Sequence, residues 1–188
     1  MTFKDLLIIL NKEKPSEELK ERKEELFSLI PELKTCDGFD QNNPWHVYDV
    51  LEHTFHVVDG VSSNYIVRLA ALFHDIGKPL SYYVGEDNLG HFHGHWVKSQ
   101  EIFHKFAKKN NMDDKSRDLI EKLIFYHDLN VRKLNEEDFD KFIKEFNKDE
   151  IIMLFNLKKS DLLAHSPKYH YILEEYENTL DELLNNYF

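Results

Sequence analysis

Histidine is the residue type that first suggests chemistry in this sequence. The chain has 11 histidines among 188 residues, against a single cysteine, Cys36. Histidine is the commonest side-chain metal ligand and a frequent proton carrier. His46, Asp49, His53 and His56 follow one another at steps of three and four, which is the spacing of residues on one face of a helix. The pattern predicts a helix with one face of metal ligands or proton carriers.

A second pair of titratable residues, His74 and Asp75, follows the most apolar segment of the chain. Burying such a pair is costly unless each group has a partner. The dipeptide carries no weight by its mere presence, because 11 His and 16 Asp in 188 residues give about one His-Asp pair by chance. The neighbouring residues must therefore decide whether the pair forms a site.

The elements that would position these residues are predicted to be helices with one interruption. Few glycines and prolines, six and five, suit long helices joined by short turns. Asn64 is expected to cap the apolar helix, which Gly77 and Pro79 end. Residues 82–95 are expected to form a small β-hairpin. Apolar periodicity predicts the other helices at 2–11, 16–29, 44–58, 96–109, 113–127, 135–146, 149–165 and 167–185. The predicted fold class is all-α.

Length and composition favour one globular domain. Hydrophobic residues make up 41% and charged residues 31% of the chain, which allows both a core and solubility. We expect a helical extension at 1–43 packed on a main domain at 44–188, whose last helix is a covering helix. No apolar run approaches the roughly 20 residues of a membrane span, and the first residues do not resemble a signal peptide. A lone cysteine fits a reducing compartment. A cytoplasmic protein without membrane contact is therefore expected.

The net charge of −11 bears on the partners. An acidic surface repels a long polyphosphate chain. Extended nucleic acid is therefore not an expected partner, whereas a small phosphorylated molecule can be attracted by local cations. The oligomeric state does not follow from the sequence.

Three segments together resemble a known family. They are Asp49-Val-Leu-Glu-His-Thr54, Leu69-Ala-Ala-Leu-Phe-His-Asp-Ile-Gly-Lys-Pro79 and Lys159-Ser-Asp-Leu-Leu-Ala-His165. In this order they resemble the HD-domain superfamily of metal-dependent phosphohydrolases, with similarity over residues 44 to 165. They are most similar to the HD domain attached to CCA-adding tRNA nucleotidyltransferases. The resemblance implies an HD-domain helical bundle with the hairpin as a small insertion.

The resemblance also implies a set of metal ligands. Family members hold one divalent metal with residues that correspond to His53, His74, Asp75 and Asp161, and some hold a second metal through residues that correspond to His95 and His127. The alternative for the first four is a buried salt-bridge cluster, which is expensive without a metal. Imidazole and carboxylate without thiolate favour Mn, Fe, Co, Ni or Zn, as one or two ions.

The implied activity is hydrolysis of a phosphate ester, either a monoester or a diester, by metal-activated water. Asp75 is expected to bridge or orient the metals. Lys78 is either a cation that the helix dipole stabilises at the end of a helix, or a phosphate contact that acts in catalysis. His46 and His165 either support the ligands or bind substrate. A nucleotide is the substrate class that the resemblance suggests. Two alternatives stay open: a non-catalytic nucleotide or metal sensor, and a di-iron oxygenase.

The sequence departs from the resemblance at two points. Trp96 stands where a Glu often follows the Gly-His step. Asp138-Phe-Asp140 lies in a helical pattern with no Gly-Ser turn before it, so addition of CTP or ATP to tRNA is not expected. The remaining histidines are assigned no role. His56, His104 and His170 are expected to be capping, surface or hydrogen-bonded core residues, and His91 and His93 are expected at exposed strand positions.

Overall fold

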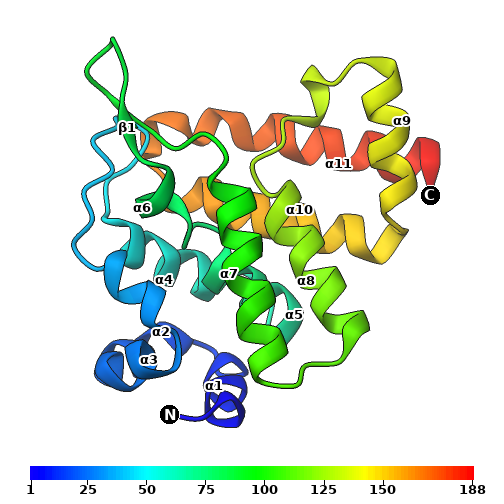
Figure 1. The fold of residues 1–188 in the computed structure, drawn as a ribbon. Coiled ribbons are helices and arrows are strands. Elements are labelled where there is room, and N and C mark those ends of the chain that lie inside the picture. The colour runs from blue at the N-terminus through cyan, green and yellow to red at the C-terminus, as the bar shows by residue number, and fades with distance from the viewer.

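A computed structural model describes all 188 residues and shows an all-α bundle with one small hairpin (Figure 1). The helices are α1 (Phe3–Leu10), α2 (Pro15–Glu21), α3 (Lys23–Leu29), α4 (Val50–Gly60), α5 (Tyr65–Phe73), α6 (Lys78–Ser81), α7 (His95–Lys109), α8 (Asp114–Tyr126), α9 (Glu136–Glu145), α10 (Lys148–Ala164) and α11 (Leu173–Tyr187). Short 3-10 turns are η1 (Pro31–Thr35), η2 (Val131–Lys133) and η3 (Pro167–Ile172). Strands β1 (Tyr83–Val84) and β2 (Gly90–His91) pair antiparallel. The predicted fold class is confirmed.

Helix α5 is the centre of the bundle. It contacts α1, α4, α7, α8 and α10, and every residue from Ile66 to Phe73 is buried. As predicted, Asn64 caps it, with the side-chain oxygen accepting from Ile66 N–H at 2.9 Å. The helix has one charged residue, Arg68, whose guanidinium donates to the carbonyls of Leu10 and Ser62 at 2.8 and 3.2 Å. These bonds satisfy the buried cation and tie the end of α1 to α5.

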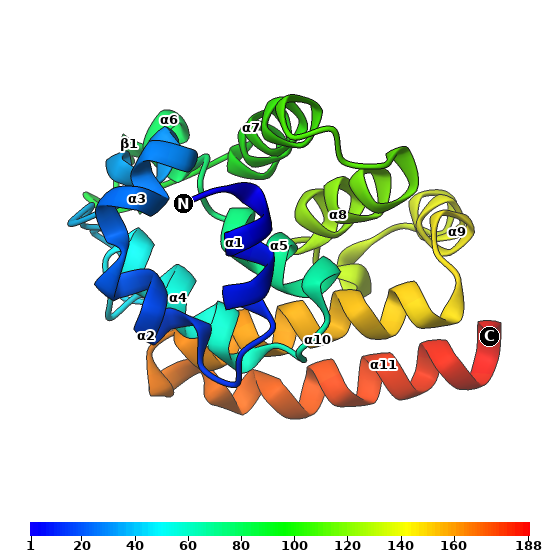
Figure 2. The same ribbon diagram turned by 90° about the horizontal axis from the view of Figure 1, so that it is seen from below.

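The first part of the chain forms three short helices on one side of the bundle (Figure 2). Helix α1 contacts α5, and α2 contacts α4. Leu6, Leu19 and Leu26 belong to the same buried core as the rest of the molecule. The single helix predicted at 16–29 is wrong, because Arg22 leaves helical geometry, with φ −105° and ψ 29°, and separates α2 from α3.

The helix predicted at 44–58 begins later than expected. Asp49 is its N-cap, and the carboxylate accepts from Glu52 N–H at 2.8 Å. Residues 44–49 lie outside regular helix. The predicted shared face is also wrong: His53 is fully buried, whereas His56 is exposed. An aspartate side chain that bonds the backbone ahead of it favours a helix start over helix continuation.

The hairpin predicted at 82–95 is present, but its strands are shorter. Tyr83 pairs with His91 and Val84 with Gly90. Gly90 N–H donates to Asn42 O at 2.7 Å, and Asn43 Nδ2 donates to Gly90 O at 3.0 Å. A Cβ at Gly90 would collide with Gln41 O. These contacts fix the returning strand against the loop that precedes α4.

The last two helices run side by side at one edge of the molecule, where α11 covers α10 (Figure 2). Thr179 and Leu183 are the buried residues of α11, which is the amphipathic pattern of a covering helix. The helix predicted at 167–185 begins instead as a 3-10 turn, η3, and becomes α-helical at Leu173. No helix combines the length and apolar composition that a membrane span requires.

Candidate metal centre

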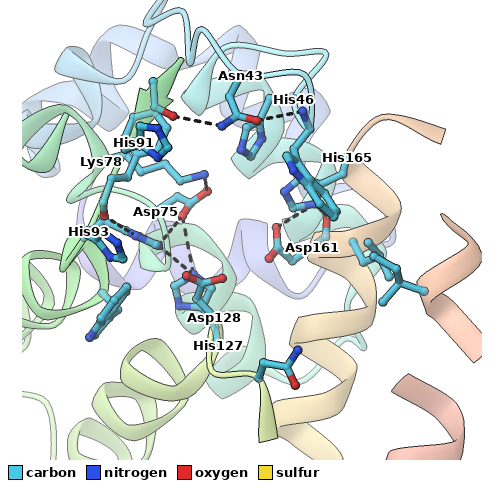
Figure 3. A pocket seen from close by; sticks show the side chains of 18 of the residues that line it. Asn43, His46, Asp75, Lys78, His91, His93, His127, Asp128, Asp161 and His165 are labelled. Carbon is cyan, nitrogen blue, oxygen red and sulfur yellow. Dashed lines mark hydrogen bonds and ion pairs between the residues drawn. The ribbon is translucent and has the colours of Figure 1, made fainter. Parts of the chain in front are cut away.

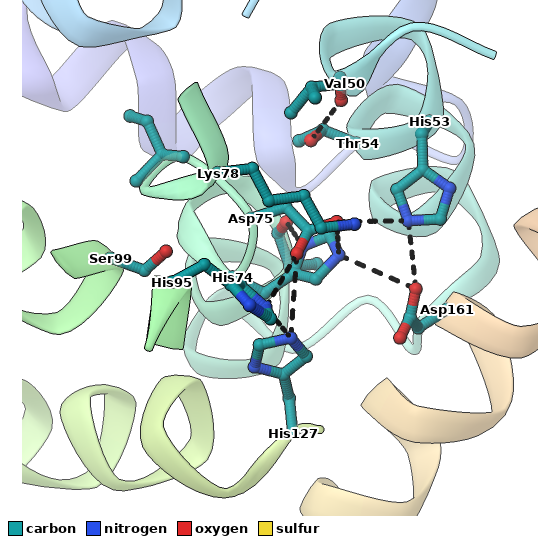
Figure 4. Close-up of polar contacts among 12 residues, drawn as sticks. Val50, His53, Thr54, His74, Asp75, Lys78, His95, Ser99, His127 and Asp161 are labelled. Atoms are coloured by element: carbon teal, nitrogen blue, oxygen red, sulfur yellow. Dashed lines mark hydrogen bonds and ion pairs between the residues drawn. The ribbon is translucent and has the colours of Figure 1, made fainter. Parts of the chain in front are cut away.

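Four residues from three separate segments meet in the interior of the bundle (Figure 4). They are His53 from α4, His74 and Asp75 from the turn after α5, and Asp161 from α10. His53 Nε2 lies 2.9 Å from Asp161 Oδ1 and 3.5 Å from Asp75 Oδ2. His74 Nε2 lies 3.2 Å from Asp75 Oδ2. The four ligand atoms all lie within 4.8 Å of one another, so this group could hold a metal ion.

A second group shares Asp75. Its other carboxylate oxygen, Oδ1, lies 3.2 Å from His95 Nε2 and 3.7 Å from His127 Nε2. The two imidazole Nε2 atoms are 3.2 Å apart. All three side chains are buried. The carboxylate of Asp75 therefore presents one oxygen to each group of ligand atoms.

Backbone carbonyls fix the direction of three of these imidazoles. His74 Nδ1 lies 2.7 Å from Ala71 O, His127 Nδ1 lies 2.7 Å from Ile124 O, and His95 Nδ1 lies 3.0 Å from Phe92 O. In each case the carbonyl belongs to the residue three positions earlier. A carbonyl accepts only from an N–H, so the bond places the proton on Nδ1 and leaves Nε2 as the ligand atom.

The protonation of the first group follows from burial and the two carboxylates. Burial lowers the pKa of His53 to about 4, so its imidazole is neutral at neutral pH. At His74 burial opposes a charge, but the Asp75 and Asp161 carboxylates outweigh it and raise the pKa to about 10. Burial likewise opposes charge on Asp75, but His74 and Lys78 hold its pKa well below the usual value. The carboxylates thus favour a positive charge between them, which a divalent ion supplies on release of the proton.

The donor atoms also fit a transition-metal ion. His74 Nε2 is buried and lacks a hydrogen bond of good geometry, whereas buried polar atoms in folded proteins nearly always have one. Imidazole nitrogen and carboxylate oxygen without thiolate suit Mn, Fe, Co, Ni or Zn. The six residues expected from the sequence as ligands are therefore brought together, in two groups that meet at Asp75.

Lys78 lies directly beside this centre. Its Nζ is 2.7 Å from Asp75 Oδ2 and donates to Gln41 Oε1 at 2.8 Å. The residue is only 5% exposed, and Nζ lies 5.2 Å from the centre of the Phe92 ring. Gln41 was not singled out from the sequence, because nothing local marks a loop glutamine as the partner of a lysine 37 positions away.

His46 and His165 stand together beside the first group. Their ring centres are 4.6 Å apart, and each lies near His53, at 5.5 and 5.1 Å. His165 Nδ1 lies 2.7 Å from Asp161 O. Burial lowers the pKa of His46, so its imidazole stays neutral. His46 reaches this position from a loop, and not from the helix face that the spacing predicted.

Asp75, Asp161, His95 and His127 border one cavity of about 600 Å³ together with Lys78, His46 and His165 (Figure 3). The imidazoles of His53 and His74 lie behind its lining. His91 and His93 lie on one side of it, and His46 and His165 lie on the other, with Asp75 between them (Figure 3). The sequence predicted His91 and His93 as exposed strand positions. His91 is half-buried and bonded to Asp87 at 3.0 Å, whereas His93 is exposed. His56, His104 and His170 do not border the cavity.

A buried lysine lies behind the second group. Lys158 of α10 donates to His127 O and Leu129 O at 2.6 and 2.8 Å, and its Nζ lies 5.5 Å from the centre of the Tyr176 ring. Burial lowers its pKa to about 8. The sequence offered one signal for it that was not used: Lys158 continues the apolar line of Leu154 and Leu162 at steps of four.

Together, the all-helical bundle and the histidine–aspartate groups around one shared carboxylate define a class of helical domain whose interior could hold metal ions. The model of the HD domain family matches residues 46–182. This match covers most of the chain, which therefore belongs to the HD domain family, a superfamily of metal-dependent phosphohydrolases.

A distant similarity to a viral protein is also found. The chain is 26% identical over 162 residues to RNA-directed RNA polymerase L of Ippy mammarenavirus (isolate Rat/Central African Republic/Dak An B 188 d/1970). The similarity covers 83% of this chain but 7% of the polymerase. Because the chain spans such a small part of that protein, the polymerase activity is not transferred to it.

Proposed function

We propose that this protein hydrolyses a phosphate ester of a nucleotide or of another small molecule. One observation carries the proposal: two groups of ligand atoms share Asp75, and each group reaches a single cavity of about 600 Å³, the first through Asp161 and the second through His95 and His127. A cavity of this size accommodates a small ligand. When bound, divalent ions would supply Lewis acidity toward a phosphoryl oxygen and a nucleophile from water at neutral pH.

The residues of the chain supply position and charge. His53, His74, Asp75 and Asp161 would hold one ion, and Asp75, His95 and His127 would hold another. Lys78 is a fixed cation beside Asp75 at the cavity, where it would offset charge on a phosphoryl oxygen. Gln41 and Asp75 hold its ammonium group in place, so little reorganisation is needed when substrate binds. His46 and His165 would contact the substrate on the other side.

The substrate class is drawn from chemistry and from resemblance. The similarity to the HD domain attached to CCA-adding enzymes favours a nucleotide, as either a monoester or a cyclic diester. The net charge of −11 disfavours a long nucleic acid, which would meet the acidic surface repeatedly. We therefore propose a small phosphorylated substrate for a cytoplasmic enzyme.

The test combines metal content with turnover. The purified protein is subjected to elemental analysis, and a panel of phosphate monoesters and diesters is screened with the bound element restored. We expect at least one of Mn, Fe, Co, Ni and Zn, and hydrolysis of at least one ester under anaerobic conditions, with release of phosphate from a monoester or of a monoester from a diester. Asp140→Ala, at an exposed residue of α9 that does not border the cavity, is the matched control for Asp75→Ala. Ligand binding without turnover across the panel would instead indicate a sensor, and iron with oxygen-dependent turnover would indicate an oxygenase.

A further inference from the structure

Trp45 borders the cavity, and two hydrogen bonds anchor its backbone there. Its backbone N–H donates to Asn43 Oδ1 at 3.0 Å, and its carbonyl accepts from Ser166 N–H at 2.8 Å. The second bond joins the loop before α4 to the segment after α10. The side chain borders the cavity and is nevertheless 37% exposed. A large aromatic ring is thus fixed in place with part of its surface open to solvent.

One face of this ring is supported by a second aromatic residue. Tyr169 stacks on Trp45 with ring centres 3.6 Å apart and an angle of 13° between the planes. The other aromatic neighbour, His165, meets Trp45 nearly at right angles, at 87° and 6.3 Å. No second ring stacks parallel to Trp45. An indole with one supported face can accept a further planar group, because aromatic systems favour offset stacking.

The position of Trp45 relative to the metal centre indicates which class of ligand could place a planar group on it. His165 neighbours both, with its ring centre 6.3 Å from that of Trp45 and 5.1 Å from that of His53. A ligand with its phosphate at the metal centre therefore spans one imidazole ring before it reaches Trp45. A nucleotide has this layout, since a ribose separates its planar base from its phosphate.

We propose that Trp45, supported by Tyr169, is the stacking platform for the base of a nucleotide whose phosphate lies at the metal centre, an inference that rests on the proposed phosphohydrolase function. The substrate class narrows to molecules that carry a nucleobase. Stacking accepts every base because each has a π-face, so the site discriminates weakly between purines and pyrimidines. Sugar phosphates without a base are poor ligands.

The test measures binding, and turnover does not enter it. The protein is titrated in a calorimeter as purified, with its bound metal. The ligands are non-hydrolysable 5′-phosphonate analogues of adenosine and uridine, and ribose 5-phosphonate serves as the ligand without a base. We expect both nucleoside phosphonates to bind roughly tenfold tighter than ribose 5-phosphonate, within the range measured for base–aromatic stacking. Trp45→Leu should abolish this difference, and Trp45→Phe should retain most of it.

Tyr48→Leu is the matched control. Tyr48 is 38% exposed, close to the value of Trp45, and stacks on His56 with ring centres 4.3 Å apart, but it does not border the cavity. This variant should bind all three ligands as the unmodified protein does. If Trp45→Leu fails to fold, equal affinity of the unmodified protein for the three ligands still overturns the proposal.

The outcomes separate the two proposals. Equal affinity for ribose 5-phosphonate and the nucleoside analogues, or a base preference that Trp45→Leu leaves intact, overturns the platform. Base-dependent binding in a protein that hydrolyses no ester supports the platform and contradicts the proposed function. Ester hydrolysis in a protein whose ligand affinity does not depend on the base contradicts the platform and supports the proposed function.

Discussion

His53 Nε2 lies 2.9 Å from Asp161 Oδ1, although 108 residues separate the two along the chain. The contact requires α4 and α10 to pack closely. They do so where Gly60 meets Ser160, whose Oγ donates to Val57 O at 2.9 Å. A Cβ at Gly60 would collide with Ser160 Oγ. The metal centre therefore depends on a helix contact that contains none of its ligands.

Gly60→Ala should destabilise the protein through this contact. We expect the free energy of unfolding to fall by about 1–3 kcal/mol, the usual effect of overpacking. Urea denaturation measures it. Because Oγ is the colliding atom, Ser160→Ala in the same chain should recover most of the loss, and the double-mutant cycle isolates the coupling. If the two substitutions simply add, the collision is not the cause.

Asp75 and Asp161 should differ in their effect on metal content. Asp75→Ala removes an oxygen from both groups of ligand atoms, so we expect loss of all bound metal and of activity, with the helical far-UV signal retained. Asp161→Ala affects one group, so part of the metal content should remain. Elemental analysis distinguishes the two variants. Equal metal loss in both would argue against two sites that share Asp75.

Lys158 should matter for metal binding, and its neighbour Lys159 should not. Lys158→Met leaves the carbonyls of His127 and Leu129 without their donor, which frees the segment that positions the His127 imidazole. We expect a loss of metal affinity of roughly 10–100-fold, as for other groups that orient a ligand. Competition with a chelator measures it. Lys159→Met, which removes only an exposed ion pair with Glu177 at 2.6 Å, should leave metal affinity unchanged.

Cys36 should make stability depend on alkaline pH. Burial raises the pKa of its thiol from 9.0 to about 12. Between these values the unfolded chain loses the thiol proton while the folded chain keeps it, so this contribution to the free energy of unfolding falls as pH rises. Full stabilisation from this residue is present below pH 9.

The comparison with Cys36→Ala isolates the thiol. Urea denaturation of both proteins at pH 8 and pH 10 should show the stability difference shrinking by about 1.4 kcal/mol in the direction that disfavours the native cysteine. The cavity that alanine leaves adds the same offset at both pH values. A difference that does not change with pH would show that the thiol titrates normally in the folded protein.

Much of the fold follows from local patterns in the sequence. The helices from α7 to α10 and the hairpin were predicted from apolar periodicity and turn residues, and their ends differ by few positions. The errors lie where a single residue ends or interrupts a helix that the neighbouring residues favour. Asp49 caps α4 and so ends the predicted continuation to Pro44, and Arg22 interrupts a segment whose periodicity reads straight through it.

The site was predictable only in part, for a different reason. The motifs indicated which histidines and aspartates to expect together, but the residues that hold them are distant in sequence and carry no motif. Gln41 bonds Lys78, and Tyr169 supports Trp45. Such partners come together only when the chain folds, because they are distant from one another in the sequence. His46 shows the limit clearly, because it reaches His53 from a loop, although the helix that was predicted to carry both residues begins only at Val50.

The attachment of the hairpin has a practical consequence. Its returning strand is held at Gly90 by Asn42 and Asn43, whereas Glu86, Asp87 and Asn88 at its tip are exposed. Extra residues placed between Glu86 and Asp87 would extend outward from the exposed tip, while the contacts of Asp87 with His91 and of Asn42 with Gly90 keep the cavity wall in place. An epitope or a fluorophore-binding tag inserted there would report on the protein while leaving its interior chemistry undisturbed.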